Sequence, residues 1–381
     1  MANELMRKAM QQIAASKKSA DQMPWTPDQP HPQPYYAFDG RAWEPHQPET
    51  GTGTGAGAGT GSAAGPDSSF SRLALYSWNI DFMLPHAEER MRSALAHLEP
   101  LVTATTTTPT AAVVIFLQEC VASDLATIAA APWVRDRFYL SDLTPAAWES
   151  GHYGTAALVD RRLPAPRSVF RVHYAQTRME RDALFVDLLL HSSSSRDGGS
   201  SDDGKGKEKK LIRLCNTHLE SLALDPPLRP AQVKLFAGYM HGSNDDDTTT
   251  TAATTGDGKQ PPKAHGAVAA GDFNAIQPFD RTLHADNGLR DAFLERGGRE
   301  DTPEAYTWGQ QAPTGLRNMY GCSRMDKVYF CGGLKLLKFE RFGADVQLEG
   351  GSYKEEFEGF DIEKPWITDH LGIMAEFDVV D

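Results

Sequence analysis

The chain has 381 residues, 40% of them hydrophobic, and a formal net charge of −13 from 38 basic and 51 acidic side chains. This length and apolar content can bury one large core or two modest ones. No apolar run approaches the roughly 20 residues of a membrane span, and we expect neither a membrane segment nor a signal peptide. The acidic balance argues against a broad, non-specific grip on duplex DNA and against attraction to a membrane surface.

Three kinds of segment precede residue 70. Residues 1–20 carry an apolar stripe at helical spacing, which predicts a short amphipathic helix that is either marginal alone or binds a partner: Leu5, Met6, Ala9, Met10 and Ile13. The stretch 24–48 is rich in proline but also in aromatics, so we expect PYYAFDGRAW (34–43) to dock on the rest of the chain. The Gly/Thr-rich run 51–65 is typical of a flexible linker and marks the boundary of a domain comprising 70–381.

From residue 70 the pattern alternates between strands and helices. Helical patterns cover 89–101 and 230–241, and a further helix begins at Ser123. Low-complexity runs at 103–110, 192–210 and 243–263 fall between these elements and are interpreted as solvated surface insertions. Strand-like runs cover 73–80, 112–119, 155–162, 170–175, 183–191, 211–219, 264–273, 323–330 and 365–377, with 183–191 and 211–219 as a hairpin.

The strand 264–273 delivers Asp272 and Asn274 at its end, in the motif GDFN. Side chains two apart on an extended strand point to the same side, so a carboxylate and an amide can converge on one water or phosphate oxygen. Other apolar runs also carry polar groups at or near their ends: Asn79, Glu119, Asn216, His218, Ser221, Asp326, Asp369 and His370. A set so rich in oxygen suits a hard cation such as Mg²⁺ better than zinc.

Each of these groups also has a purely local interpretation. GDFN could be a turn after a strand, Glu119 could cap the next helix, and His218 could be a satisfied core histidine. Their recurrence in several segments favours a shared site. The four cysteines lack CxxC spacing, so we expect buried free thiols in a reducing compartment rather than disulfides or zinc ligands: Cys120, Cys215, Cys322 and Cys331.

The order of these motifs resembles the endonuclease/exonuclease/phosphatase superfamily over residues 70–381, about four-fifths of the chain. The series is WN (78–79), QE (118–119), NTHLES (216–221), GDFN (271–274), RMDKVYF (324–330) and TDH (368–370). Within the superfamily, HYGTA (152–156), THLES, YTW (306–308) and RMDKVYF are most similar to the 5′-tyrosyl-DNA phosphodiesterases of type 2. The resemblance implies a four-layer α/β/β/α sandwich of two stacked mixed sheets with outer helices.

The resemblance also implies roles for individual residues. Glu119 would be the principal Mg²⁺ ligand, with Mn²⁺ as the alternative ion, and Asn79 and Asp369 would support the metal. Asp272 would orient and deprotonate the attacking water, which Asn274 would help to hold. His218 and His370 would donate hydrogen bonds to the phosphoryl oxygens, and Asp326 would fix the His370 imidazole.

The substrate implied by the resemblance is a DNA 5′ end that carries a tyrosyl adduct, with Trp308, Tyr153 and Ser221 as contacts. An intracellular DNA-repair enzyme is expected, in the nucleus rather than the cytoplasm, and the N-terminal segment could hold a protein partner. The family's arginine after GDxN is replaced by Ile276 and Gln277, with Arg281 as a candidate substitute. An apurinic-site endonuclease, a deadenylase-like nuclease, a lipid or inositol phosphoesterase and a non-catalytic binding module remain alternatives.

Overall fold

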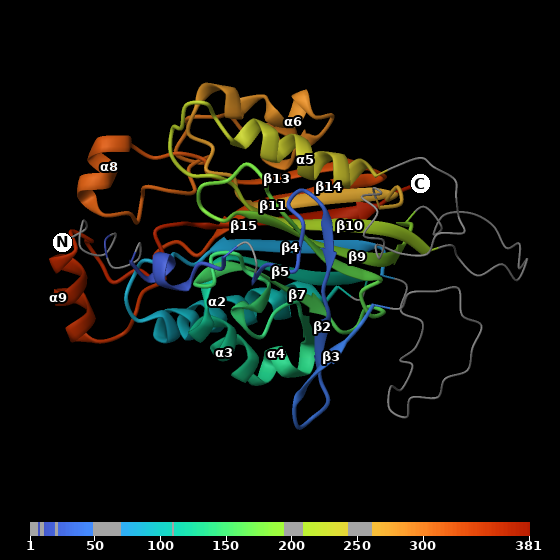
Figure 1. The fold of residues 1–381 in the computed structure, drawn as a ribbon, viewed down its shortest axis with the longest axis horizontal. Coiled ribbons are helices and arrows are strands. Elements are labelled where there is room, and N and C mark those ends of the chain that lie inside the picture. The colour runs from blue at the N-terminus through green and yellow to red at the C-terminus, as the bar shows by residue number, and fades with distance from the viewer. Residues whose placement is uncertain are drawn as a thin grey trace, which may run out of the picture.

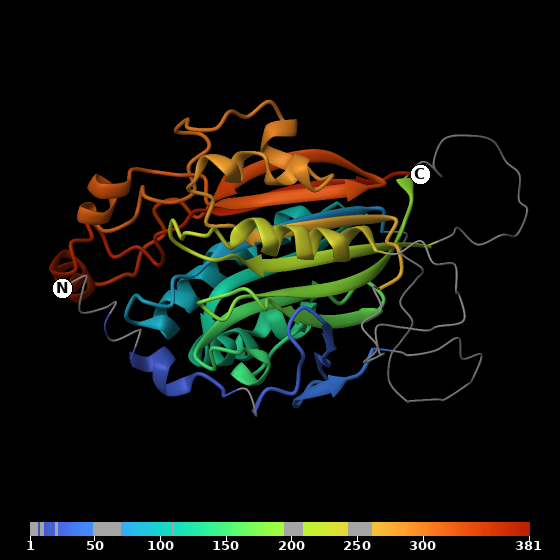
Figure 2. The same ribbon diagram turned by 45° about the horizontal axis from the view of Figure 1, so that its top comes forward.

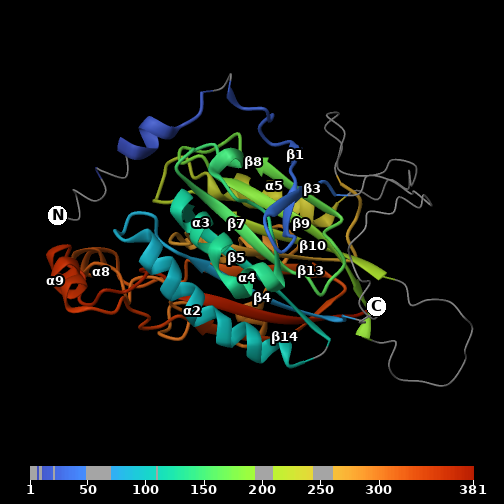
Figure 3. The ribbon, with the colours of Figure 1, turned by 90° about the horizontal axis from the view of Figure 1, so that it is seen from below.

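Two β-sheets stack face to face, and helices cover the outer face of each (Figure 1). The computed structural model describes residues 7, 11–19, 22–48, 70–108, 110–193, 209–242 and 261–381. Helices α5 and α6 lie on one side of the stack and α2, α3 and α4 on the other, as Figures 1 and 3 show. The expected four-layer α/β/β/α sandwich is confirmed.

One sheet has eight strands and the other has seven, and both are mixed. Only β4–β5 and β10–β11 are parallel pairs; the other pairs in the described chain are antiparallel. The larger sheet has the order β14 (Leu334–Phe342), β15 (Gly372–Val379), β4 (Arg72–Asn79), β5 (Ala111–Val121), β7 (Tyr153–Asp160), β6 (Phe138–Leu140), β2 (Tyr35–Phe38) and β3 (Trp43–His46). The smaller has the order β1 (Pro30–Pro32), β8 (Ser168–His173), β9 (Asp182–His191), β10 (Lys209–His218), β11 (Gly266–Asp272), β13 (Asp326–Gly332) and β12 (Arg290–Asp291).

The helices differ in the sheet that they cover. Residues of α2 and α3 pack on the larger sheet together with α4, whereas α5 packs on the smaller one, where Figure 2 shows it lying across the strands. Their bounds are α2 (Ala87–Thr106), α3 (Ala122–Ala130), α4 (Pro132–Arg137), α5 (Arg229–His241), α6 (Leu283–Asp286), α7 (Ala292–Glu295), α8 (Thr314–Tyr320) and α9 (Gly351–Gly359), with short 3₁₀ turns η2 (Pro145–Ala147) and η4 (Pro278–Arg281).

Strand β4 shows why the sequence gives four layers. Leu73 and Leu75 face the core between the two sheets, whereas Ala74, Tyr76 and Trp78 face the core under the helices. Successive side chains of a strand point to opposite faces, so a strand with apolar side chains on both faces must be covered on both sides. The sandwich buries both sets.

The N-terminal proline-rich segment joins both sheets. Strand β1 pairs with β8 of the smaller sheet, and β2 pairs with β6 of the larger sheet and forms a hairpin with β3. Trp25 stacks on His173 with ring centroids 3.9 Å apart. The expected docking of 34–43 is confirmed, because its aromatic side chains pack within the chain. The division of the chain at 51–65 lies outside the described residues and stays a prediction, as does a protein partner for the N-terminus.

The interpretation of 103–110 as a surface insertion was wrong for residues 103–106, which belong to a helix. Helix α2 passes Pro100 and continues to Thr106, because Val102 is buried on its inner face. The hydroxyl groups of Tyr76 and Thr105 also hydrogen bond at 2.6 Å, which ties this last turn to the sheet. Most of the other two insertions, 194–208 and 243–260, lies outside the described residues, at positions between β9 and β10 and between α5 and β11.

Three further expectations concern termini, membranes and cysteines. Residues 11–16 are helical, whereas Leu5, Met6, Ala9 and Met10 of the expected N-terminal helix lie outside the described residues. Within the part of the chain that is described, no helix combines the length and apolarity needed to cross a bilayer. All four cysteines are free thiols, as expected, but only Cys120 and Cys215 are buried, whereas Cys322 and Cys331 are partly exposed.

Candidate active site

The two parallel strand pairs bring the predicted polar residues to one edge of the sandwich. Strands β4 and β5 run parallel in one sheet, and β10 and β11 run parallel in the other. The Asn79 amide, at the end of β4, donates to Asp272 Oδ2 at 2.9 Å, at the end of β11. This contact joins the carboxyl ends of the two pairs across the sheets. Side chains from both sheets therefore share one buried site.

The glycine of GDFN permits the close approach of β10 and β11. Gly271 has a φ of 150°, and a Cβ at this position would lie 1.8 Å from the Thr217 carbonyl oxygen. Only glycine fits there. The register consequently places Asp272 directly opposite His218. The backbone N–H of Asn274 donates to Asp272 Oδ1 at 2.8 Å, in a tight turn in which Asn274 itself has a φ of 48°.

Asp272 lies at the centre of the site. Besides the Asn79 amide, its Oδ2 atom faces His218 Nε2 at 3.4 Å and His370 Nε2 at 3.6 Å. Burial raises the pKa of the Asp272 carboxyl, and the His370 charge lowers it in part. A buried carboxylate that is surrounded by hydrogen-bond donors is suited to hold and deprotonate a water molecule.

The tautomer of His218 is set by an arginine. Arg181 Nη1 lies 2.7 Å from His218 Nδ1, and a guanidinium can only donate, so Nδ1 accepts and the proton is on Nε2. Burial, followed by the charge of Arg181, lowers the pKa of His218 well below its usual value, so the ring is neutral. Its Nε2–H has no hydrogen-bond partner in the described chain and faces Asp272 and Glu119.

His370 has the opposite character. Its Nδ1 atom lies 2.8 Å from Asp326 Oδ2, and its Nε2 atom lies 3.7 Å from Asp369 Oδ1. Burial lowers the pKa of His370, but the charges of Asp326, Asp272 and Asp369 outweigh this effect and raise it well above the usual value. The site thus combines one neutral and one cationic imidazole.

Further carboxylates surround this pair of histidines. Glu119 has a φ of 59°, at an irregularity in the pairing of β5 with β7, and its Oε2 accepts the backbone N–H of Phe82 at 3.0 Å. Burial raises the pKa of Glu119. Asp81 is also buried, and burial followed by the charges of Asp369 and Glu119 raises its pKa well above the usual value. Backbone strain at such residues persists only where the surrounding structure imposes it.

This donor set fits a divalent cation. The buried Glu119 and Asp81 and the partly buried Asp369 influence one another electrostatically, which is costly unless a cation compensates them. Their oxygen atoms, with the side chain of Asn79 nearby, suit Mg²⁺ or Mn²⁺. Atoms of Asp272, Asp326 and His370 also lie within 4.8 Å of one another. We assign these three to hydrogen bonding, because the 2.8 Å contact of His370 with Asp326 is that of an ion pair.

The three predicted substrate contacts lie beside this centre, but two of them are mainly packing residues. The Trp308 side chain is only 9% exposed, and its Nε1 donates to Asp369 Oδ2 at 2.6 Å. The ring of Tyr153 is buried against Phe82 at 4.3 Å, and its hydroxyl donates to the Met179 carbonyl. The Tyr153 ring is therefore already covered by Phe82 and by the Arg181 guanidinium. Ser221 Oγ accepts from Arg181 Nη2 at 3.4 Å and is partly exposed.

Sequence reasoning missed three residues of the site. Asp81 lies two positions after Asn79, which is the spacing of Asp272 and Asn274 in GDFN. The same rule, that side chains two apart point to one side, could have found it. Phe82 is partly exposed and stacks on Tyr153. Arg181 is buried, lies 5.3 Å from the centre of the Tyr153 ring and fixes His218. No local sequence signal indicates Arg181, because its partners come from other strands.

The position after GDFN is apolar in the structure as in the sequence. Ile276 is 42% exposed, and the Gln277 side chain accepts a hydrogen bond from Arg229. Arg281, the candidate substitute for the missing arginine, pairs with Asp301 at 2.5 Å. This ion pair is exposed on both sides, so it holds Arg281 only weakly.

The comparisons with known proteins agree with this site. A model of the Endonuclease/Exonuclease/phosphatase family matches residues 76–370. The protein therefore belongs to this family, which comprises phosphate-ester hydrolases of nuclease and phosphatase type. A search of curated protein sequences found no match.

Solved structures of TDP2 are similar to this chain, which confirms the resemblance seen in the motifs. A truncated Caenorhabditis elegans TDP2 is 21% identical, with a TM-score of 0.54 over 81% of this chain and 97% of that one. D. rerio TDP2 complexed with a single-strand DNA product is 16% identical, with a TM-score of 0.54 over 81% and 99%. A humanized D. rerio TDP2 gives 16% and 0.53 over the same shares. These likenesses establish the fold.

Proposed function

We propose that the protein is a divalent-metal-dependent phosphodiesterase that hydrolyses 5′-phosphotyrosyl bonds at DNA ends. The observation that carries this proposal is the meeting of Asp272 with Asn79, His218 and His370 at one buried point, beside the carboxylate of Glu119. This arrangement offers a base, two imidazole donors and oxygen ligands within reach of one phosphate group.

The roles of the residues follow from their hydrogen bonds. Asp272 orients the attacking water and accepts its proton, while the Asn79 amide holds the carboxylate in place. The Nε2–H groups of His218 and His370 donate to phosphoryl oxygens as negative charge builds on them. Glu119, with Asp81 and Asp369, would hold the cation, which supplies charge compensation at the phosphate when bound.

A tyrosyl leaving group suits this set of catalytic side chains. Phenol has a pKa of about 10, several units below that of an alkyl alcohol, so its departure requires little protonation. Among the described residues, each buried carboxyl of the site already has another role, in holding the cation, the attacking water or His370. None is left to protonate a leaving group. The cationic His370 and the guanidinium of Arg181, which sits over Tyr153, provide positive charge instead.

Two observations support a nucleic-acid end as the substrate. The motifs resemble those of the 5′-tyrosyl-DNA phosphodiesterases, and one structural neighbour is described as a complex with a single-strand DNA product. The net charge of −13 disfavours extended contact with the phosphate backbone, whereas a strand end needs only local contacts. A role in DNA repair in the nucleus belongs to the same proposal.

The test is a comparison of oligonucleotides of identical sequence with Mg²⁺ present. We expect the 5′-phosphotyrosyl oligonucleotide to be cleaved at least a hundredfold faster than 3′-tyrosyl, abasic and unmodified strands. Asp272→Asn should abolish this activity, whereas the exposed Asp286→Asn should not. Faster cleavage of abasic or internal linkages would reassign the protein to an endonuclease, and activity on inositol or lipid phosphates alone would reassign it to those substrates.

A further inference from the structure

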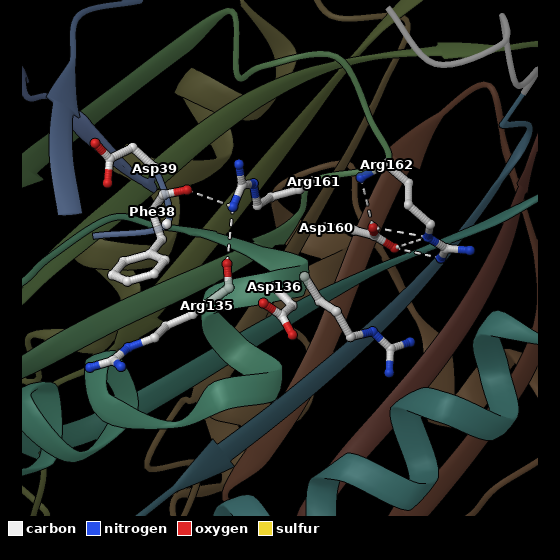
Figure 4. Close-up of a pocket in the computed structure, with 9 residues that line it drawn as sticks. Phe38, Asp39, Arg135, Asp136, Asp160, Arg161 and Arg162 are labelled. Atoms are coloured by element: carbon white, nitrogen blue, oxygen red, sulfur yellow. Dashed lines mark hydrogen bonds and ion pairs between the residues drawn. The ribbon is translucent and has the colours of Figure 1, made fainter. Parts of the chain in front are cut away.

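A second site lies at the end of the sandwich opposite the candidate active site. It is a pocket of about 620 Å³ whose lining is dominated by charged side chains (Figure 4). Tyr153, at the start of β7, borders the active site, whereas Asp160, at the end of the same strand, lines this pocket. Seven residues of an extended strand span roughly 23 Å, so the two sites are separate.

Three guanidiniums of this pocket have no carboxylate partner in the described chain. Arg161 donates to the carbonyl oxygens of Phe38 and Arg135, both at 3.0 Å. Arg137 donates to the hydroxyl groups of two threonines of α2, and Arg135 Nε donates to the carbonyl oxygen of Ala129 at 2.8 Å. Neutral acceptors thus hold the three cations in place and leave their charges uncompensated. Figure 4 shows Arg135, Asp136 and Arg161 among the side chains that line the pocket.

The carboxylates in the pocket are fewer than the arginines, and only one of them forms an ion pair there in the described chain. Asp160 is paired with Arg162, which is the fourth arginine of the lining. Asp39 accepts the backbone N–H groups of Arg41 and Ala42 in the turn between β2 and β3. Asp39 and the exposed Asp136 form no ion pair among the described residues, so the lining of four arginines and three aspartates carries a net charge of +1. In a protein with a net charge of −13, such a local excess of positive charge is distinctive.

We propose that this pocket binds a small anion that carries at least two phosphoryl groups, such as pyrophosphate or the diphosphate of a nucleotide. Guanidinium forks match phosphate oxygens and form strong charge-assisted hydrogen bonds with them. The volume is within the usual range of small-molecule sites and exceeds what a single phosphate fills.

The N-terminal hairpin forms one wall of the pocket. Phe38, Asp39 and Gly40 come from the hairpin, and Arg161 ties the Phe38 carbonyl to the loop after β7. The Arg135 guanidinium lies 5.0 Å from the centre of the Phe38 ring. A bound anion would therefore contact cations that themselves hold the hairpin. Binding should lower the rate of amide hydrogen exchange in β2 and β3.

The experiment measures binding by calorimetry to the full chain in EDTA, so that no divalent ion links the ligand to the active site. Pyrophosphate, ADP and orthophosphate are the probes, and Arg135→Gln and Arg137→Gln are the variants. Arg92→Gln is the matched control, because Arg92 is an exposed arginine of α2 outside the pocket. Thermal unfolding and hydrolysis of an aryl phosphodiester verify that each variant is folded, and both should be unchanged.

We expect pyrophosphate or ADP to bind at least tenfold more tightly than orthophosphate. Either pocket variant should raise the dissociation constant at least tenfold, and the control should leave it unchanged. Tighter binding of ADP than pyrophosphate would identify a nucleotide as the source of the phosphoryl groups, and equal binding would identify the inorganic anion. Absence of binding, or binding that both pocket variants retain, would overturn the proposal. Hydrogen exchange in β2 and β3 that is unaffected by ligand would overturn the coupling to the hairpin.

Discussion

Replacing Asp326 by asparagine tests the most specific contact of the site. Asp326 and His370 form a 2.8 Å bond between side chains that are almost completely buried. A positioned proton donor or transition-state hydrogen-bond donor contributes about 10²–10⁴-fold to the rate, and Asp326 is what orients the His370 donor. We therefore expect Asp326→Asn to lower kcat by at least a hundredfold. An asparagine amide can also reverse the imidazole tautomer, which removes the proton from Nε2.

The assay is steady-state hydrolysis of a chromogenic aryl phosphodiester as a function of pH. Because Asp326 acts through His370 and does not itself reach the phosphate, KM should change by less than threefold. Asp326 is also among the charges that raise the pKa of His370, so the alkaline limb of the kcat profile should move to lower pH in the variant. Asp286→Asn is the control. A kcat within threefold of the wild type, or a loss that appears only in KM, would refute the reasoning.

Three further outcomes are expected. Asp272→Asn and His370→Ala should each lower turnover at least a hundredfold. Since both groups act on one phosphate, the double variant should lose far less than the product of the two losses. Turnover losses that multiply in a kinetic comparison would contradict this. Burial and nearby cations lower the pKa of His173 to about 2 from 6.5, so the native state binds fewer protons than the unfolded state and loses about 2 kcal/mol of stability between pH 6.5 and pH 5. His173→Phe, which keeps the stack on Trp25, should remove most of that loss in chemical denaturation, and an unchanged pH dependence would exclude His173 as its source. Ile276→Arg should make the KM for single strands more dependent on salt, with the slope of log KM against log salt increased by about 0.7, and an unchanged slope would place Ile276 away from the strand.

Strand ends could be predicted from the sequence because their chemistry is local. In β4, Leu73 and Tyr76 point to opposite faces of the sheet, and this alternation depends only on neighbouring residues. The same is true of the GDFN turn at Asp272. Parallel pairing then brings Asn79 and Asp272 to the same edge. The family resemblance placed Asp326 beside His370, and the structure has them in contact.

The parts that could not be predicted depend on contacts between distant segments. Arg181, which immediately precedes β9, fixes the proton of His218 in β10, and its own neighbours in sequence carry no sign of this role. Trp308 as a stacking contact for substrate stays a prediction, and the hydrogen bond from its indole N–H to the partly buried carboxylate of Asp369 could not be foreseen from the sequence. The basic pocket around Arg161 exists only because the N-terminal hairpin docks beside it.

The central claim is that buried carboxylates at this edge hold a divalent cation for phosphodiester hydrolysis. The most direct measurement is the Mg²⁺ titration of aryl phosphodiester hydrolysis after removal of metal with EDTA, for the wild type, Glu119→Gln and the exposed control Glu99→Gln. The account predicts no activity without metal, full recovery with Mg²⁺ in the wild type and control, and at least a tenfold higher Mg²⁺ requirement with lower turnover in Glu119→Gln at unchanged Tm. Full hydrolysis without metal, or an unaltered titration in Glu119→Gln, would contradict it.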